Sequence, residues 1–122
     1  MHLKDLPAGQ IMVDAMQTGV CVDLTYRNSK GVVEEKTAEV HAVGVSSKGV
    51  PCARVWQMGG ESAWGEPEGW KMLSLTGVER IKPVLGARSQ APRPGYNPGD
   101  KGMGTIFAEI SSEPVPSEKT LA

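Results

Sequence analysis

Glycine and proline divide this chain into short segments, and that division limits the fold more than any other feature of the sequence. The 122 residues include 15 Gly and 9 Pro, and both residue types end helices and mark turns. Chain reversals at this density suit short strands, so a helix bundle is disfavoured. We expect one domain over residues 1–110, followed by a disordered polar tail at residues 111–122.

Apolar and polar residues alternate in the segments between these turns. The clearest alternation covers residues 20–27, and a period of two is typical of a strand with one buried face. Its apolar face consists of Val20, Val22, Leu24 and Tyr26. Further strands are predicted over residues 36–45, 52–58, 70–75, 81–85 and 106–110. The predicted fold class is therefore mainly β.

Two breaks in the strand pattern indicate how the sheet is shaped. In the second predicted strand, Ala42 shares a face with Val40, and the apolar phase then changes next to Gly44, which predicts a bulge or bend. Pro83 lacks the amide proton that a central strand needs, so its strand belongs at an edge. Short strands with a bent second member predict a small curled sheet.

One short helix precedes the strands. Residues 8–18 place Ile11, Ala15 and Met16 on one face, with Met12 beside them, at the spacing of an amphipathic helix. We expect this face to plug the sheet.

Charge and targeting signals exclude several classes of partner. The 13 basic and 14 acidic side chains nearly cancel, so any site for a polyanion must be local. The chain has no apolar run of about 18 residues, and its start lacks the apolar stretch of a signal peptide. We therefore expect a cytoplasmic protein without a membrane partner, in which Cys21 and Cys52 stay reduced.

The inventory of reactive side chains argues against catalysis. His2 and His41 are the only histidines, and a nucleophilic enzyme needs a histidine beside a serine or cysteine, together with an orienting acid. Glu61, Glu66 and Glu68 lie in a glycine-rich segment and are interpreted as solvated charges. The two cysteines and two histidines form no recognisable metal set, and no glycine motif for a cofactor opens a helix. The prediction is a non-enzymatic binding protein without a cofactor.

Four segments resemble the WYL-domain family, in particular its small standalone members without an attached helix-turn-helix. They are Glu-Val-His-Ala-Val-Gly-Val at 39–45, Ala-Arg-Val-Trp-Gln at 53–57, Gly-Trp-Lys-Met at 69–72 and Arg-Pro-Gly-Tyr-Asn-Pro at 93–98. The Trp-Tyr-Leu tripeptide of the family is absent, and Lys71 stands where the family often has an arginine. The resemblance implies a small SH3-like or Sm-like β-barrel of about five to six strands. It also implies binding of nucleic-acid fragments or nucleotide-like ligands to regulate another activity.

Basic and aromatic side chains form the predicted ligand site. The candidate contacts are Arg54, Trp56, Trp70, Lys71, Arg93, Tyr96 and Asn97. An aromatic ring stacks on a base while cations meet phosphate, at about 1–3 kcal/mol per stacked base. The alternative is structural, because each tryptophan could belong to the core and Tyr96 could anchor the proline-rich segment of residues 86–104. The predicted ligand is a nucleotide or a short single-stranded nucleic acid.

Two other functions fit the same sequence. A phage or mobile-element protein of this kind could be a sponge that sequesters a cyclic or modified nucleotide immune signal, with sites between subunits. Alternatively, the barrel edge or the segment 59–69 could dock on a partner protein as an adaptor. Short edge strands, and three Trp in a chain with a modest core, predict a homo-oligomer.

Overall fold

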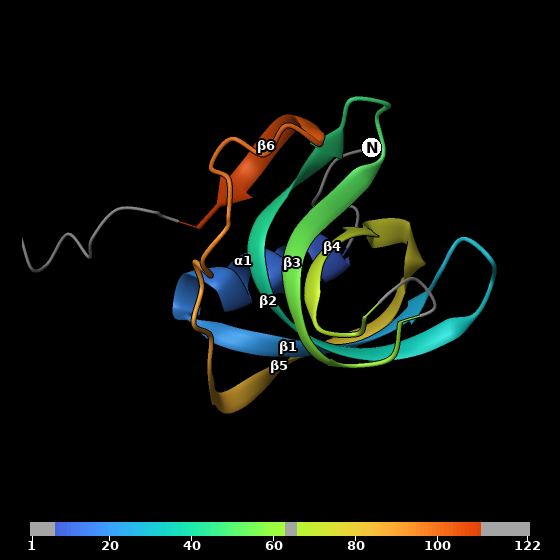
Figure 1. Cartoon of the computed structure of the whole chain (residues 1–122), viewed down its shortest axis with the longest axis vertical. Helices are drawn as coiled ribbons and strands as arrows, with labels where there is room; N and C mark the ends of the chain where they lie inside the picture. The colour runs from blue at the N-terminus through green and yellow to red at the C-terminus, as the bar shows by residue number, and fades with distance from the viewer. Residues whose placement is uncertain (1–6, 63–65, 111–122) are drawn as a thin grey trace, which may run out of the picture.

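A short helix and six strands of one antiparallel sheet make up the computed structural model, which describes residues 7–62 and 66–110 (Figure 1). The elements are α1 (Pro7–Thr18), β1 (Val20–Arg27), β2 (Val33–Ser46), β3 (Pro51–Gly60), β4 (Gly69–Ser74), the 3-10 turn η2 (Leu75–Gly77), β5 (Val78–Arg88) and β6 (Met103–Glu109). The mainly β fold with one N-terminal helix is confirmed. The predicted tail at 111–122 and Trp64 lie outside the described residues.

β2 is the centre of the sheet because it pairs with three other strands. Its first half pairs with β1, its last residues pair with β6, and β3 follows its opposite edge. The register with β3 shifts between Val40 and Ala42, so His41 is an extra residue without a partner on β3. Such a bulge bends a strand and increases its twist. The predicted bend in this strand is therefore present, but it begins at His41.

The bulge decides which side chains of β2 face the main core. Val40 and Val43 both pack in the main core, whereas Ala42 packs in a small second cluster on the outer face. The prediction that Ala42 shares a face with Val40 is therefore wrong, because the phase changes at His41. A second register shift does lie next to Gly44, but it occurs between β2 and β6.

The sheet is strongly curled, because its two end strands are neighbours along the chain. The hydrogen-bonded order is β4-β3-β2-β1-β5, and a flat sheet of this kind would separate β4 from β5 by about 19 Å. The connection is only the three residues of η2, which span about 6 Å in 3-10 geometry. At this end the Ser74 N–H donates to the Tyr26 hydroxyl at 3.1 Å, linking β4 to β1. The sheet nevertheless stays open, since no ladder joins β4 to β5 in the described chain.

α1 packs against the inner face of the curled sheet, in contact with β1, β2 and β5. It buries Met12, Ala15 and Met16, whereas Ile11, predicted on the same face, is only half-buried. The strands and η2 complete the main core with Val22, Leu24, Ala38, Val40, Val43, Ala53, Val55 and Leu73 from the strands and Leu75 from η2. In the described part of the chain, no helix is long and apolar enough to cross a membrane.

β5 extends well beyond its predicted range of 81–85. Its side chains are mostly exposed, so the apolar alternation that marks a half-buried strand is weak there. Pro83 lies in this strand, and β5 pairs with β1 alone. The predicted edge position of Pro83 is confirmed, because a strand with one neighbour tolerates a missing amide proton.

Gly44→Ala is expected to destabilise the protein by about 1–3 kcal/mol, a typical cost of overpacking. A Cβ at Gly44 would lie 2.1 Å from the Thr105 carbonyl oxygen, so β6 would have to move away from β2. Chemical denaturation measures the loss. Gly59→Ala is the matched control, because a Cβ there meets no atom within 4 Å. Equal losses in the two variants would contradict this explanation.

Candidate ligand-binding site

The chain between β5 and β6, residues 89–102, forms a loop that runs in front of α1 in the view of Figure 1. Its contacts on the sheet alternate with core residues, so it lies on the outer face, opposite the main core. The loop contacts side chains from β2, β3 and β4. Three prolines stiffen it. The following contacts hold it in place and shape a pocket beneath it.

The first fixed point of the loop is Glu39 on β2, whose side chain has 0% exposed surface. Arg93 Nε donates to Glu39 Oε1 at 2.5 Å, and the Gln90 N–H donates to Oε2. The hydrogen bond with Glu39 raises the pKa of the Arg93 guanidinium. The same cation lies over the Trp56 ring, 5.6 Å from its centroid. Arg93 is therefore engaged within the protein on both sides.

The second fixed point is His41, the bulge residue, which is also fully buried. The Arg93 N–H donates to His41 Nε2 at 2.9 Å, so the ring proton is on Nδ1 and donates to the Glu39 carbonyl oxygen at 3.1 Å. Burial lowers the pKa of His41. The histidine is therefore neutral, and both ring nitrogens serve to hold the loop.

The third fixed point is an ion pair between Arg54 on β3 and Asp100 in the loop. Arg54 donates from Nε at 2.5 Å and from Nη2 at 3.2 Å to the two carboxylate oxygens, and the Gly102 N–H donates to Oδ1 at 2.8 Å. The hydrogen bond from Arg54 lowers the pKa of Asp100. Asp100 therefore holds a fixed negative charge beside an arginine that stays partly exposed.

Aromatic rings fill the space between these polar contacts. Trp70 on β4 lies edge-on to Trp56 with ring centroids 5.2 Å apart, and edge-on to His41 at 4.8 Å. Tyr96 from the loop lies 5.9 Å from Trp70, and its hydroxyl donates to Glu109. Burial, followed by this hydrogen bond, raises the pKa of Tyr96. Tyr96 thus anchors the loop, as the structural alternative for this residue predicted.

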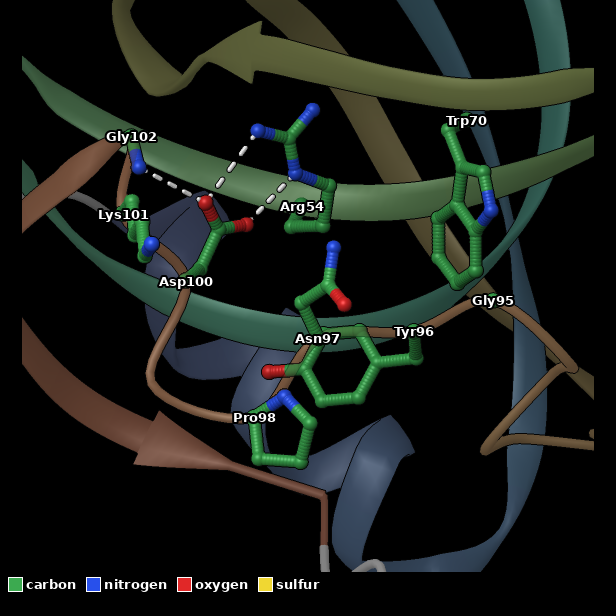
Figure 2. Close-up of a pocket in the computed structure, with 9 residues that line it drawn as sticks. All are labelled: Arg54, Trp70, Gly95, Tyr96, Asn97, Pro98, Asp100, Lys101 and Gly102. Carbon is green, nitrogen blue, oxygen red and sulfur yellow. Dashed lines mark hydrogen bonds and ion pairs between the residues drawn. The ribbon is translucent and has the colours of Figure 1, made fainter.

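A pocket of about 640 Å³ lies between the loop and the outer face of β3 and β4 (Figure 2). Its lining consists of Arg54, Trp70, Gly95, Tyr96, Asn97, Pro98, Asp100, Lys101 and Gly102. Figure 2 shows Lys101 and Asp100 at one side of the pocket and Trp70 at the other. Gly95 has a φ of +92°, and a Cβ there would lie 3.4 Å from Trp70 Nε1, so the left-handed turn against the indole favours glycine.

The structure brings together most, but not all, of the predicted contacts. Arg54, Trp70, Tyr96 and Asn97 line the pocket. Trp56 and Arg93 lie beside it and stack on each other. Lys71 is separate, because it pairs with the core residue Val55 and so faces the opposite side of the sheet from Trp70. Its Nζ donates to the Glu66 carbonyl oxygen at 2.7 Å.

Sequence reasoning missed Asp100 and Lys101, which supply two of the charges of the pocket. The only signal for them in the sequence is their position between Gly99 and Gly102, which is typical of a tight turn in a loop, where binding residues are often found. It also missed the structural role of Glu39, since a polar residue that alternates with apolar ones in a strand is normally solvent-facing.

The two cysteine thiols and the side chains that could ligate a metal ion are the remaining groups of chemical interest in residues 7–62 and 66–110. Burial raises the pKa of both Cys21 and Cys52, and both thiols are free and buried. Within the same ranges, no three histidine, cysteine or carboxylate side chains come together to hold a metal ion.

Comparisons with known proteins give no relative from which a function can be transferred. A scan against models of protein families, a search of curated proteins and a search of solved structures each found no match. The geometry and charge of the pocket are therefore the basis for inferring its function.

Arg93→Ala is expected to lower the free energy of unfolding by about 3 kcal/mol or more, because the buried Glu39 carboxylate loses its partner. Adding Glu39→Gln should recover part of this loss, since a neutral amide costs less to bury than a charge. Chemical denaturation of the single and double variants measures both effects. Arg80→Ala, at an exposed site on β5, is the control. Equal stability of the Arg93 and Arg80 variants would show that the ion pair is not structural.

The stability of the protein is expected to fall as the pH is lowered below 6.5, the ordinary pKa of histidine. Because the folded-state pKa of His41 is lowered, the unfolded chain takes up the proton first, and the loss ends below the folded-state pKa. Denaturation between about pH 7.5 and pH 5 measures this slope. His41→Gln, whose amide oxygen can accept the Arg93 N–H, should flatten it. If the pH dependence of the stability is unchanged in His41→Gln, titratable groups other than His41 cause it.

Proposed function

We propose that this protein binds a nucleotide or a short single-stranded nucleic acid in the pocket beneath the loop, without converting it. One observation supports this above all others: a partly exposed indole and two cationic side chains line the same pocket of about 640 Å³. A nucleotide presents a flat base and an anionic phosphate that are joined through one sugar. Stacking surfaces combined with cations are the usual means by which proteins hold such ligands.

The phosphate is assigned to Arg54 and Lys101. A guanidinium has five N–H groups, and Asp100 accepts from two of the nitrogens of Arg54, Nε and Nη2. The donors that remain can reach a phosphate oxygen in the pocket. Lys101 is exposed at the pocket wall and adds a mobile second cation. Counterion release from this contact makes the binding salt-dependent.

The base is assigned to the Trp70 side of the pocket. The ring of Trp70 is fixed by edge contacts with Trp56 and His41, so it offers a preorganised stacking surface. The Asn97 side chain is exposed at the pocket, and an amide both donates to and accepts from a base edge. Figure 2 shows this amide between Arg54 and the Tyr96 ring.

Binding without turnover is supported by the state of the reactive groups near the loop. His41 uses both ring nitrogens in structural hydrogen bonds, so it has no lone pair or proton to offer a substrate. The raised pKa of Cys21 and of Cys52 disfavours the nucleophilic thiolate.

We also propose that this domain is a WYL-like member of the small SH3-like or Sm-like barrels and that it acts in the cytoplasm. The curled sheet supports only the barrel-like architecture. The edges of the sheet approach one another at η2. β2 bends at the His41 bulge and pairs with β1, β3 and β6.

A sensor and a sponge would share the pocket beneath the loop. Slow dissociation from a stoichiometric complex would favour the sponge.

Lys101→Ala is expected to weaken nucleotide binding about fivefold to tenfold at low salt and to reduce the slope of log K against log salt by about one. Titration calorimetry with the four ribonucleoside monophosphates and with short mixed oligonucleotides measures both quantities. Lys82→Ala is the matched control, because this lysine is exposed on β5 and does not line the pocket. Equal affinity of the two variants would show that the ligand does not bind in this pocket.

A further inference from the structure

We infer that the pocket selects a phosphodiester, with one negative charge, over a phosphomonoester with two, and that Asp100 is the residue that discriminates between them. The inference rests on the proposed function, since it assumes that the pocket holds the phosphate of a nucleotide. It adds the chemical class of the phosphate: an internal or cyclic linkage.

The first step is that the charge of Asp100 cannot leave the pocket wall. Asp100 is only 7% exposed. Its carboxylate accepts hydrogen bonds from Arg54 and from the Gly102 N–H. Rotating it away would leave both donors without their partner, at a cost typical of broken charged hydrogen bonds. The lowered pKa of Asp100 keeps the carboxylate ionised at neutral pH.

The second step is the charge balance of the pocket. The charged side chains in its lining are the cations Arg54 and Lys101 and the anion Asp100. The carboxylate of Asp100, in its bidentate pair with Arg54, already compensates the charge of the guanidinium. The lining therefore has a net charge of about one positive unit, which Lys101 supplies. Glu109, which accepts from the Tyr96 hydroxyl and the Gly99 N–H, adds a further negative charge behind the lining. The pocket therefore offers only a weak positive potential.

The third step compares how attraction and desolvation depend on ligand charge. Attraction to the pocket grows in proportion to the charge, whereas the cost of removing an ion from water grows with its square. A strongly positive site favours a dianion, but a weakly positive one favours a monoanion. A phosphomonoester carries about 1.5 to 2 negative charges at neutral pH. A phosphodiester carries one, which matches the net charge of the lining.

The test uses ligands that differ by one charge and little else. The probes are the four ribonucleoside 5′-monophosphates and the methyl esters of their phosphate groups (nucleoside 5′-methylphosphates), titrated calorimetrically at about pH 8, where the monoester is a dianion. We expect the methyl esters to bind about tenfold more tightly to the unmodified protein, the size of effect for one charge near a partly solvated carboxylate. The ratio of the two affinities is the readout.

Three variants assign the ratio to Asp100. Asp100→Asn should reduce the preference for the methyl ester to below about threefold, because the pocket becomes more positive. Lys101→Gln should increase it, since the pocket loses its net charge, and this variant changes an exposed side chain. Glu79→Gln is the matched control, because it removes one negative charge from the exposed pair with Arg27, and it should keep the ratio of the unmodified protein.

Each failure has a distinct meaning. If the unmodified protein binds the two ligand types equally, or binds the monoester more tightly, the inferred selectivity is wrong. The proposed function would still hold, because the protein would still bind nucleotides. A preference that survives Asp100→Asn, or that Lys101→Gln does not increase, would overturn the role of the pocket charges. If Asp100→Asn does not fold, the Lys101→Gln ratio decides alone. No binding of any of these probes or of a mixed oligonucleotide would overturn the proposed function itself.

Discussion

The buried carboxylate of Glu39 is the group on which the outer face of this protein depends. A fully buried negative charge is tolerated only when a cation and further hydrogen-bond donors satisfy it. Arg93 and the Gln90 amide provide these partners, and both come from the loop. The sheet therefore needs the loop, because without it the charge on β2 would be unpaired. The loop in turn needs the sheet, since prolines and glycines give it no regular structure of its own.

The bulge at His41 makes this mutual dependence possible. In a regular strand, Glu39 and His41 would lie on one face with Val43, but the extra residue sends Val43 into the main core. His41 can then accept the Arg93 N–H while its other nitrogen donates to the β2 backbone. One irregularity thus bends β2, shapes the core and fixes the loop. The position of Trp70 follows, because its ring packs edge-on to His41.

The sequence predicts the strands well and the site only in part, for reasons that particular residues make clear. Period-two alternation identifies β1 because one face is buried and the other is not, whereas β5 is exposed along most of its length and gives a weak signal. Lys71 and Trp70 are adjacent in sequence and were predicted together, yet neighbouring residues of a strand point to opposite faces. Asp100 gives only a weak signal in the sequence, its position between Gly99 and Gly102, because its role depends on Arg54, which is distant in the chain.

The short connection at η2 has a consequence for how such a pocket can change over time. One wall of the pocket consists of strands whose curvature is set by the core and by the three residues that join the edges of the sheet. The other wall is a loop outside that core. Substitutions at the exposed lining positions Asn97 and Lys101 can therefore alter ligand preference at little cost to folding, whereas the strands and the loop anchors Tyr96 and Asp100 must stay nearly constant. New specificities can thus arise by drift at a few exposed positions of one loop, while its anchors keep the pocket in place.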